Sequence, residues 1–178
     1  MKNLLVCVDY QNDFVTGALG FEAAQKLCGG IAARVKAQLE SGGYLIFTRD
    51  THTDNYLNTP EGKFLPVPHC IKGTYGHSLF GELARYEKEP CPNMLIVDKP
   101  TFGCAEIAEK AAALCGGTPD KIELCGVVTN ICVISNAILL QTAFPNAEII
   151  INSPLCAAIG TAHENALEIM RGLGMTVL

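Results

Sequence analysis

Short apolar runs rich in β-branched residues alternate along this chain with longer stretches of helical spacing, and this alternation strongly limits the possible folds. Strands of a parallel sheet covered by helices are buried on both faces, so they are short and almost continuously apolar. The runs of that character are residues 4–8, 44–48, 94–97, 121–126, 147–151 and 175–177. The sequence therefore predicts an α/β protein with three layers, αβα, around a six-stranded, mostly parallel sheet.

The intervening stretches repeat apolar residues every three or four positions, which is the period of a helix with one buried face. The predicted helices are 22–39, with Gly29 and Gly30 as a candidate break, and 77–86, 105–114, 131–142 and 161–173. A chain of 178 residues has the usual size of one well-cored domain, so we expect a single domain over residues 1–178.

Composition excludes several classes of protein. Hydrophobic residues make up 49% of the chain and charged residues 17%, against a usual charged share of roughly 25%, which excludes intrinsic disorder. The net charge of −5 and the lack of a basic run give no reason to expect a nucleic-acid partner. No apolar stretch approaches the ~20 residues that cross a bilayer, so we expect no membrane contact.

Cysteine content and the start of the chain bear on location. An odd count of nine cysteines in a chain rich in core-forming residues predicts mostly reduced, packed thiols. After Met1-Lys2-Asn3 the sequence enters a strand pattern without the features of a signal peptide. We therefore expect a cytoplasmic protein.

Polar residues that follow the predicted strands are the first candidates for chemistry, because ligands bind beyond the carboxyl ends of parallel strands. Cys132 stands where the fourth strand gives way to a helix, and a helix N-terminus favours a thiolate. Asp9 and Lys99, at the ends of what we expect to be neighbouring strands, are a candidate base and its charged partner. Taken alone, Asp9 is equally a turn residue and Lys99 a solvated lysine.

One long stretch, residues 49–76, has little periodicity and contains Pro60, Pro66 and Pro68. Loops of this length in compact domains are usually functional or disordered. It carries His52 and His69, so we expect a loop of the active site.

Six motifs, in order, resemble those of the isochorismatase-like cysteine hydrolases, and within them most closely the nicotinamidases. They are Val8-Asp9-Tyr10-Gln11-Asn12-Asp13-Phe14, Thr48-Arg49-Asp50-Thr51-His52, Pro68-His69-Cys70-Ile71, Gly73-Thr74, Asp98-Lys99-Pro100-Thr101-Phe102 and Gly126-Val127-Val128-Thr129-Asn130-Ile131-Cys132-Val133. Their spacing covers almost the whole chain.

The resemblance implies an Asp-Lys-Cys triad, with Asp9 as general base and acid, Lys99 as its charged partner and Cys132 as nucleophile. In this family the thiolate attacks an amide carbonyl, ammonia leaves, and water hydrolyses the thioester. The resemblance also implies an oxyanion hole formed by the backbone N–H groups of Val128 and Cys132, with a cis peptide between Val127 and Val128.

The resemblance further implies a divalent metal held by Asp50, His52 and His69, and no organic cofactor. One carboxylate and two imidazoles suit Zn²⁺, with Mn²⁺ or Fe²⁺ as alternatives. Some members have one more ligand, which would fall near Asn58 or be replaced by Glu61. The residues alone favour the simpler interpretation, in which Asp50 caps a turn and both histidines are ordinary loop residues.

The expected substrate is a small amide, most simply nicotinamide, which would give nicotinate and ammonia. Nicotinamidases commonly carry an aromatic residue three positions before the metal histidine, where this chain has Pro66. Phe14 and Phe102 are therefore the candidate aromatic walls, with Tyr10 and Tyr56 as further options. The alternatives are a hydrolase for an N-carbamoyl or ureido compound and a non-catalytic metabolite-binding paralogue.

The family resemblance also suggests a homo-oligomer. Ile134, Ile138 and Leu139, near the nucleophile, are candidate interface residues that are equally explained as core. His77 and His163 match no ligand position of the family, and we expect both to be structural.

Overall fold

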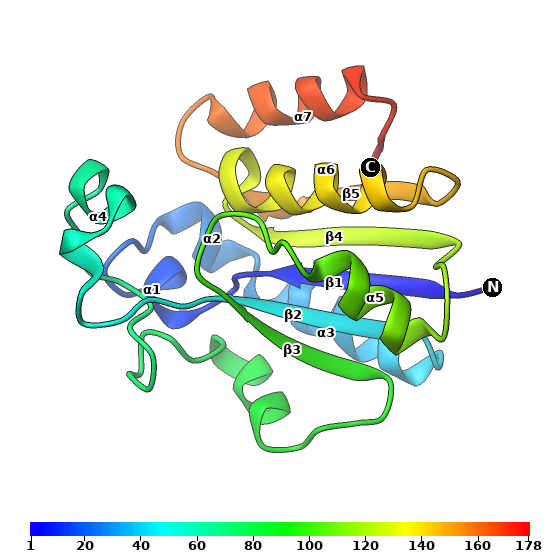
Figure 1. Ribbon diagram of the computed structural model, residues 1–178, viewed down its shortest axis with the longest axis horizontal. Helices are drawn as coiled ribbons and strands as arrows, with labels where there is room; N and C mark the ends of the chain where they lie inside the picture. The colour runs from blue at the N-terminus through cyan, green and yellow to red at the C-terminus, as the bar shows by residue number, and fades with distance from the viewer.

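The computed structural model describes residues 1–178 and contains one six-stranded sheet between two layers of helices (Figure 1). The strands are β1 (Asn3–Val8), β2 (Tyr44–Asp50), β3 (Met94–Lys99), β4 (Lys121–Val127), β5 (Glu148–Ala157) and β6 (Thr176–Val177). Their order is β3-β2-β1-β4-β5-β6, and every neighbouring pair is parallel. The predicted three-layer fold is confirmed, and the sheet is parallel throughout.

The α-helices are α1 (Asn12–Val15), α2 (Glu22–Lys26), α3 (Cys28–Glu40), α4 (Pro60–Phe64), α5 (Ile107–Cys115), α6 (Ile134–Ala143) and α7 (Ala162–Gly172). Three further helical segments are not α-helical. They are the 3₁₀ helices η1 (Tyr56–Asn58) and η2 (Gly81–Glu87), and the π-helical turn η3 (Thr129–Val133). None of the helices has the length and apolar character needed to cross a membrane.

Side chains of the central strand alternate between two cores. Leu4, Val6 and Val8 of β1 pack in a cluster with α5, α6 and α7, whereas Leu5 and Cys7 pack in a second cluster with α1, α2, α3 and η2. Both faces of β1 are therefore buried, which explains why this strand is continuously apolar in sequence.

Two predicted helices differ from the structure. The stretch 22–39 divides at Leu27, and the two glycines lie inside α3. A Cβ on Gly30 would lie 2.5 Å from Leu155 Cδ2, so this glycine permits close packing and does not break the helix. In place of the predicted helix 77–86, the structure has the 3₁₀ helix η2, which begins only at Gly81 and ends at Glu87.

The fifth strand is longer than the predicted run 147–151. The register of β4 and β5 shifts, so that Leu124 pairs with Ile151 but Gly126 pairs with Cys156. Residues between these pairs, including Pro154, bulge out of the ladder, where a residue without an N–H is tolerated. The strand resumes after an interruption that apolar patterning cannot anticipate.

The strand order reverses at β1, because the chain adds β2 and β3 on one side of it and β4, β5 and β6 on the other. In open parallel sheets, ligands bind beyond the carboxyl ends of the strands at this switch point. Asp9 follows β1 and η3 follows β4, so both lie there. Figure 1 shows α4 standing apart from the sheet beyond the same strand ends.

Candidate active site

Asp9, Lys99 and Cys132 meet in the interior at the carboxyl end of the sheet. Lys99 Nζ lies 2.6 Å from Asp9 Oδ2 and 3.8 Å from Cys132 Sγ. All three residues are buried. The sequence placed Asp9 and Lys99 after neighbouring strands, and this was wrong: β2 lies between β1 and β3, and the long lysine side chain spans it.

Burial and charge act on the three groups in different ways. Burial lowers the pKa of Lys99, but the charges of Asp9, Cys132 and Asp50 together outweigh it, so the pKa of the ammonium is raised and it stays charged. Burial raises the pKa of Asp9, an effect that Lys99 only partly offsets. The carboxyl group therefore accepts a proton more readily than an exposed aspartate does.

The thiol does not have the lowered pKa that its place at a helix start suggested. Burial, followed by the nearby Asp9 carboxylate, raises the pKa of Cys132 well above its ordinary value. Desolvation thus outweighs the favourable helix N-terminus and the Lys99 ammonium. Such a thiol keeps its proton until a neighbouring base accepts it.

Thr48 of β2 orients the Asp9 carboxylate. Its Oγ1 donates to Asp9 Oδ1 at 2.6 Å and accepts from the Asp9 backbone N–H at 3.2 Å. Asp9 has φ 48°, a left-handed conformation that costs a non-glycine residue about 1–3 kcal/mol. The backbone therefore turns sharply at the end of β1 and directs the carboxylate toward Lys99.

The turn between β4 and Cys132 has a backbone that few residues permit. Gly126 has φ 114°, and a Cβ there would lie 2.1 Å from the carbonyl oxygen of Val8. The peptide bond between Val127 and Val128 is cis, as the family resemblance implies. Val128 and Cys132, the expected oxyanion-hole residues, line one cavity.

Asn136 is a site residue that the sequence did not indicate. It is fully buried, and its Nδ2 donates to the carbonyl oxygens of Cys132 at 2.8 Å and Phe102 at 3.3 Å. Its Oδ1 accepts from the N–H of Cys104 at 2.9 Å. This amide connects the segment after β3 to the turn that carries Cys132.

A second group of polar side chains lies beside Asp9, Lys99 and Cys132. One ligand atom from each of Asp50, His52, Glu61 and His69 lies within 4.8 Å of the others. His52 Nε2 and His69 Nε2 lie 3.0 Å and 3.3 Å from Asp50 Oδ2. Glu61 Oε1 lies 3.6 Å from His52 Nε2 and 3.9 Å from His69 Nε2.

Asn58 and Glu61 were the two candidates for a further metal ligand. Of these, only Glu61 lies in this group. Asn58 is exposed, and its amide donates to Asn55 Oδ1. Glu61 lies in the first turn of α4, which begins with Pro60 and is capped by Thr59, whose Oγ1 accepts from the N–H of Gly62 at 3.0 Å. Proline at the first helical position and threonine at the N-cap both favour a helix start here.

Backbone hydrogen bonds hold the segment around His52 beside the segment that follows His69. The N–H of His52 donates to the carbonyl of Cys70 at 3.0 Å, and the N–H of Lys72 donates to the carbonyl of His52 at 2.9 Å. His69 Nδ1 lies 2.7 Å from the carbonyl oxygen of Val67. That contact requires a proton on Nδ1, so Nε2 is the ring nitrogen that faces Asp50.

The chemistry of this group fits a divalent cation. Asp50 Oδ1 and His52 Nε2 are buried without a hydrogen-bond partner. Burial raises the pKa of Asp50, but contacts with His52 and His69 and the charge of Lys99 outweigh it, so the pKa falls below its ordinary value. The residues therefore offer an ionised carboxylate and two imidazole nitrogens, and Glu61 is the candidate for a fourth ligand.

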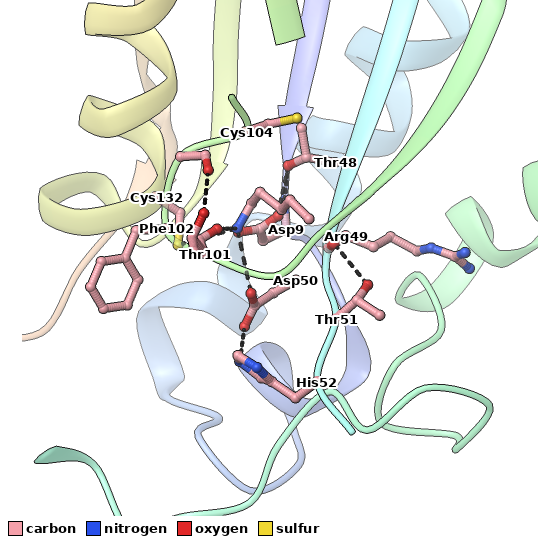
Figure 2. A network of polar contacts seen from close by, with 12 residues as sticks. Asp9, Thr48, Arg49, Asp50, Thr51, His52, Thr101, Phe102, Cys104 and Cys132 are labelled. Carbon is pink, nitrogen blue, oxygen red and sulfur yellow. Dashed lines mark hydrogen bonds and ion pairs between the residues drawn. The ribbon is translucent and has the colours of Figure 1, made fainter. Parts of the chain in front are cut away.

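Asp50 connects the two groups. Lys99 Nζ lies 3.6 Å from Asp50 Oδ1, while the other carboxylate oxygen faces the imidazoles. Figure 2 shows Asp50 between Asp9 and His52, with dashed contacts running through it.

A cavity of about 230 Å³ opens onto both groups. Its polar lining includes Cys132, Asp50, Glu61 and His69. Its apolar lining consists of Phe14 and Phe102, which the sequence indicated, and of Leu19, Phe21, Leu65, Val128, Ile131 and Ile159. No arginine or lysine side chain lines it.

Tyr10 and Tyr56 do not line this cavity. The hydroxyl of Tyr10 donates to the carbonyl of Ala24 at 2.6 Å within the core. Tyr56 packs edge-on to His69 and tilted on His52, with ring centroids 5.0 Å and 4.6 Å away. Tyr56 therefore supports the imidazoles from behind.

The other two histidines lie outside both groups. His77 is buried, with Nε2 2.8 Å from Thr51 Oγ1, and His163 Nδ1 lies 2.9 Å from Thr129 Oγ1. Neither faces the cavity.

The class of protein follows from this fold and site. It is a doubly wound, all-parallel α/β protein that buries a cysteine, a lysine and an aspartate at the switch point of the sheet, next to a carboxylate–imidazole group. Residues 3–178 match the family model described as the isochorismatase domain, and the chain belongs to the isochorismatase family.

Known relatives agree with this assignment. The chain is 33% identical over 143 residues, 78% of each protein, to a Bacillus subtilis (strain 168) protein described as the uncharacterized isochorismatase family protein PncA. The crystal structure of nicotinamidase PncA from Bacillus subtilis superposes with a TM-score of 0.87 at 31% identity, covering 99% of both chains. The pyrazinamidase/nicotinamidase of Streptococcus mutans UA159 gives 0.87 at 29% identity, covering 99% of this chain and 100% of that one.

Proposed function

We propose that this protein is an amidohydrolase that converts nicotinamide to nicotinate and ammonia through a thioester on Cys132. The observation that carries the proposal is the contact of Lys99 with both Asp9 and Cys132, next to a small apolar cavity. The nicotinamidase descriptions of structures about 30% identical to this chain support the choice of substrate.

In the first half of the reaction Cys132 attacks the amide carbonyl carbon. As the Sγ–C bond forms, the thiol proton passes to the Asp9 carboxylate, whose raised pKa suits it to accept a proton. The Lys99 ammonium stabilises the negative charge that develops on sulfur and oxygen, and the N–H groups of Val128 and Cys132 are the proposed donors to the oxyanion. Asp9 then returns the proton to the nitrogen, the C–N bond breaks, and ammonia leaves.

In the second half, water replaces ammonia. Asp9, again ionised, accepts a proton from the water as its oxygen attacks the thioester carbonyl. The C–S bond breaks, the thiolate regains the proton from Asp9, and the carboxylic acid product leaves. No organic cofactor enters either half.

We propose that Asp50, His52, Glu61 and His69 hold a divalent metal, with Zn²⁺ as the first choice and Mn²⁺ or Fe²⁺ as alternatives. A bound metal would supply a Lewis acid that fixes the pyridine nitrogen of the substrate and so orients its amide. The unpartnered buried atoms of Asp50 and His52 support this assignment.

The proposed ring site is the apolar part of the cavity. Phe14 and Phe102 provide aromatic walls, and Leu65 lines the cavity next to Pro66, where other nicotinamidases carry an aromatic residue. A cavity of about 230 Å³ lies below the ~300–1,000 Å³ of drug-sized sites and suits a one-ring amide.

The alternative substrates are N-carbamoyl or ureido compounds. Many of these carry a carboxylate, which is best bound by arginine or lysine. Since no such side chain lines the cavity, its lining favours the neutral ring amide. A non-catalytic paralogue has no need for the paired Asp9 and Lys99 beside a thiol.

The test is ammonia release from nicotinamide, pyrazinamide and a panel of N-carbamoyl and ureido compounds. We expect nicotinamide and pyrazinamide to be hydrolysed far faster than the panel, and Cys132→Ala to release no ammonia. Faster turnover of an N-carbamoyl compound would contradict the substrate, and no turnover of any amide would favour the non-catalytic alternative.

We further propose a homo-oligomer that works in the cytoplasm. Ile138 and Leu139 of α6 are exposed, whereas Ile134 is half-buried, so the first two support an interface more strongly. All nine cysteines are free, which is typical of a reducing compartment. Light scattering of wild type and Leu139→Glu tests the oligomer, which the charge is expected to weaken.

A further inference from the structure

The backbone of Asp50 lacks a strand partner on one side. The pairing of β1 with β2 ends at Val8 and Thr48, after which the N–H of Asp9 donates to the carbonyl of Thr48 at 3.1 Å and the chain turns away. On the other side of β2, the N–H of Thr51 donates to the backbone carbonyl of Lys99 in β3 at 2.9 Å. The N–H and C=O of Asp50 therefore face the space beyond the end of β1, where no strand continues.

The side chain of Gln11 occupies that space. The N–H of Asp50 donates to Gln11 Oε1 at 2.7 Å, and Gln11 Nε2 donates to the carbonyl of Asp50 at 2.9 Å. Gln11 Nε2 also donates to the carbonyl of His77 at 2.8 Å. Gln11 is fully buried, and its acceptor and both amide hydrogens are used.

We infer that Gln11 is a positioning residue for Asp50. Its amide replaces the peptide group that a longer β1 would have supplied, and so holds the Asp50 backbone while the carboxylate lies between Lys99 and the imidazoles. The inference rests on the proposed metal site, because it assigns to Gln11 the task of presenting one of its ligands.

The reciprocal contact comes from β2. Thr48 Oγ1 donates to the carboxylate of Asp9 at 2.6 Å. Asp9 lies two residues before Gln11 in the chain. The two strand ends thus hold each other: Thr48 orients the proposed base, and Gln11 orients the proposed metal ligand. Both residues are fully buried, which makes Thr48 a matched control for Gln11.

Gln11 also has a plainly structural task, since it contacts His77 and forms an antiparallel bridge with Leu79. Loss of that task lowers stability but leaves the metal affinity of the folded protein unchanged. Metal affinity therefore separates the positioning role from a merely structural one.

The test uses the full chain as wild type, Gln11→Met and Thr48→Val, each freed of metal with a chelator. Methionine keeps the length of glutamine without its hydrogen bonds, and valine keeps the shape of threonine. Three quantities are measured: the Kd for Zn²⁺ by competition with a chromophoric chelator, the Tm of the metal-free protein, and the alkylation rate of Cys132 by iodoacetamide, read by peptide mass spectrometry.

We expect Gln11→Met to raise the Kd for Zn²⁺ by roughly tenfold or more, the usual effect of losing a group that orients a metal ligand. Its metal-free alkylation rate is expected to match wild type, because Asp9 and Cys132 keep their contacts. Thr48→Val is expected to show the reverse, with unchanged Zn²⁺ affinity and slower alkylation.

An unchanged Kd in Gln11→Met, with or without a lower Tm, would overturn the inference while leaving the metal site intact. Equal weakening of Zn²⁺ binding by Thr48→Val would also overturn it, since any loss of packing at this edge would then suffice. Failure of wild type to bind Zn²⁺ and both alternatives, Mn²⁺ and Fe²⁺, would instead reject the metal site, and this role of Gln11 with it. If Gln11→Met does not fold, Gln11→Glu takes its place, because it keeps the size and the acceptor but has at most one donor for the carbonyl oxygens of Asp50 and His77, and a weakening is again expected.

Discussion

The Lys99 ammonium lies 2.6 Å from the Asp9 carboxylate, and both side chains are completely shielded from solvent. A buried ion pair is costly to break because the remaining charge is left without a partner. Here the same ammonium also lies 3.6 Å from Asp50, so its removal would leave Asp9 without its cationic partner and would take one of several favourable contacts from Asp50.

Lys99→Met should therefore destabilise the fold strongly. We expect a loss of about 3–5 kcal/mol in the free energy of unfolding at neutral pH, measured by urea denaturation. Lys110→Met, which removes a half-buried lysine paired with the exposed Glu106, serves as control and should change stability by no more than about 1 kcal/mol. Equal effects of the two substitutions would contradict the account.

The loss in Lys99→Met should also depend on pH. Without the ammonium, the pKa of buried Asp9 rises further, so the folded state binds a proton that the unfolded state releases. A raised pKa stabilises the fold at low pH, and the contribution disappears as pH rises through it. The deficit relative to wild type should therefore shrink on acidification, and a deficit independent of pH would rule out this electrostatic origin.

Reactivity of Cys132 should have an acid limit set by Asp9. Because burial raises the pKa of Asp9, we expect alkylation of Cys132 in metal-free protein to slow at a pH above the ~3.9 of an ordinary aspartate. Below the raised pKa of Asp9, its carboxyl group is protonated and cannot accept the thiol proton. Asp9→Asn should lose this step in the pH profile, and its persistence would assign the step to another group.

Glu61 and Asn58 give a direct test of the metal site. Glu61→Ala should weaken Zn²⁺ binding by roughly tenfold or more, since it removes a carboxylate that faces both imidazoles. Asn58→Ala, which alters an exposed side chain of the same segment, should leave the affinity unchanged. Titration of metal-free protein with Zn²⁺ measures both, and the opposite ranking would reassign the fourth ligand.

Phe102 should govern substrate binding with little effect on the fold. It lines the cavity although 44% of it is exposed, so Phe102→Ala should raise KM for nicotinamide while unfolding free energy changes by only about 0.5 kcal/mol. Tyr75→Ala, at an exposed aromatic away from the cavity, should change neither quantity. Steady-state kinetics decide, and an unchanged KM in Phe102→Ala would remove Phe102 from the ring site.

The sheet was predictable because strands that are buried on both faces are almost continuously apolar in sequence. That Asp9, Lys99 and Cys132 lie near one edge of the sheet was predictable, because each lies at or shortly after a strand end. That Lys99 reaches Asp9 across β2 was not predictable, since strand order depends on long-range pairing. Nor was the raised pKa of Cys132, which comes from burial by segments distant in sequence.

Other parts of the site depend on contacts with no local signature. Gly30 permits close packing against Leu155, a contact that sequence alone presents as a helix break. Leu19, Ile131 and Ile159 reach one cavity from three separate segments, and single apolar residues in loops carry no mark of a shared site. Glu61 had a detectable signal in the Thr59-Pro60 helix start, although nothing local shows where α4 lies.

The proposed thioester between Cys132 and the substrate can be trapped by rapid acid quenching of protein turning over nicotinamide, followed by peptide mass spectrometry. We expect a nicotinoyl group on the peptide that contains Cys132 and on no other cysteine peptide, together with release of ammonia. Hydrolysis of nicotinamide at the wild-type rate by Cys132→Ala, with no acylated peptide, would contradict it.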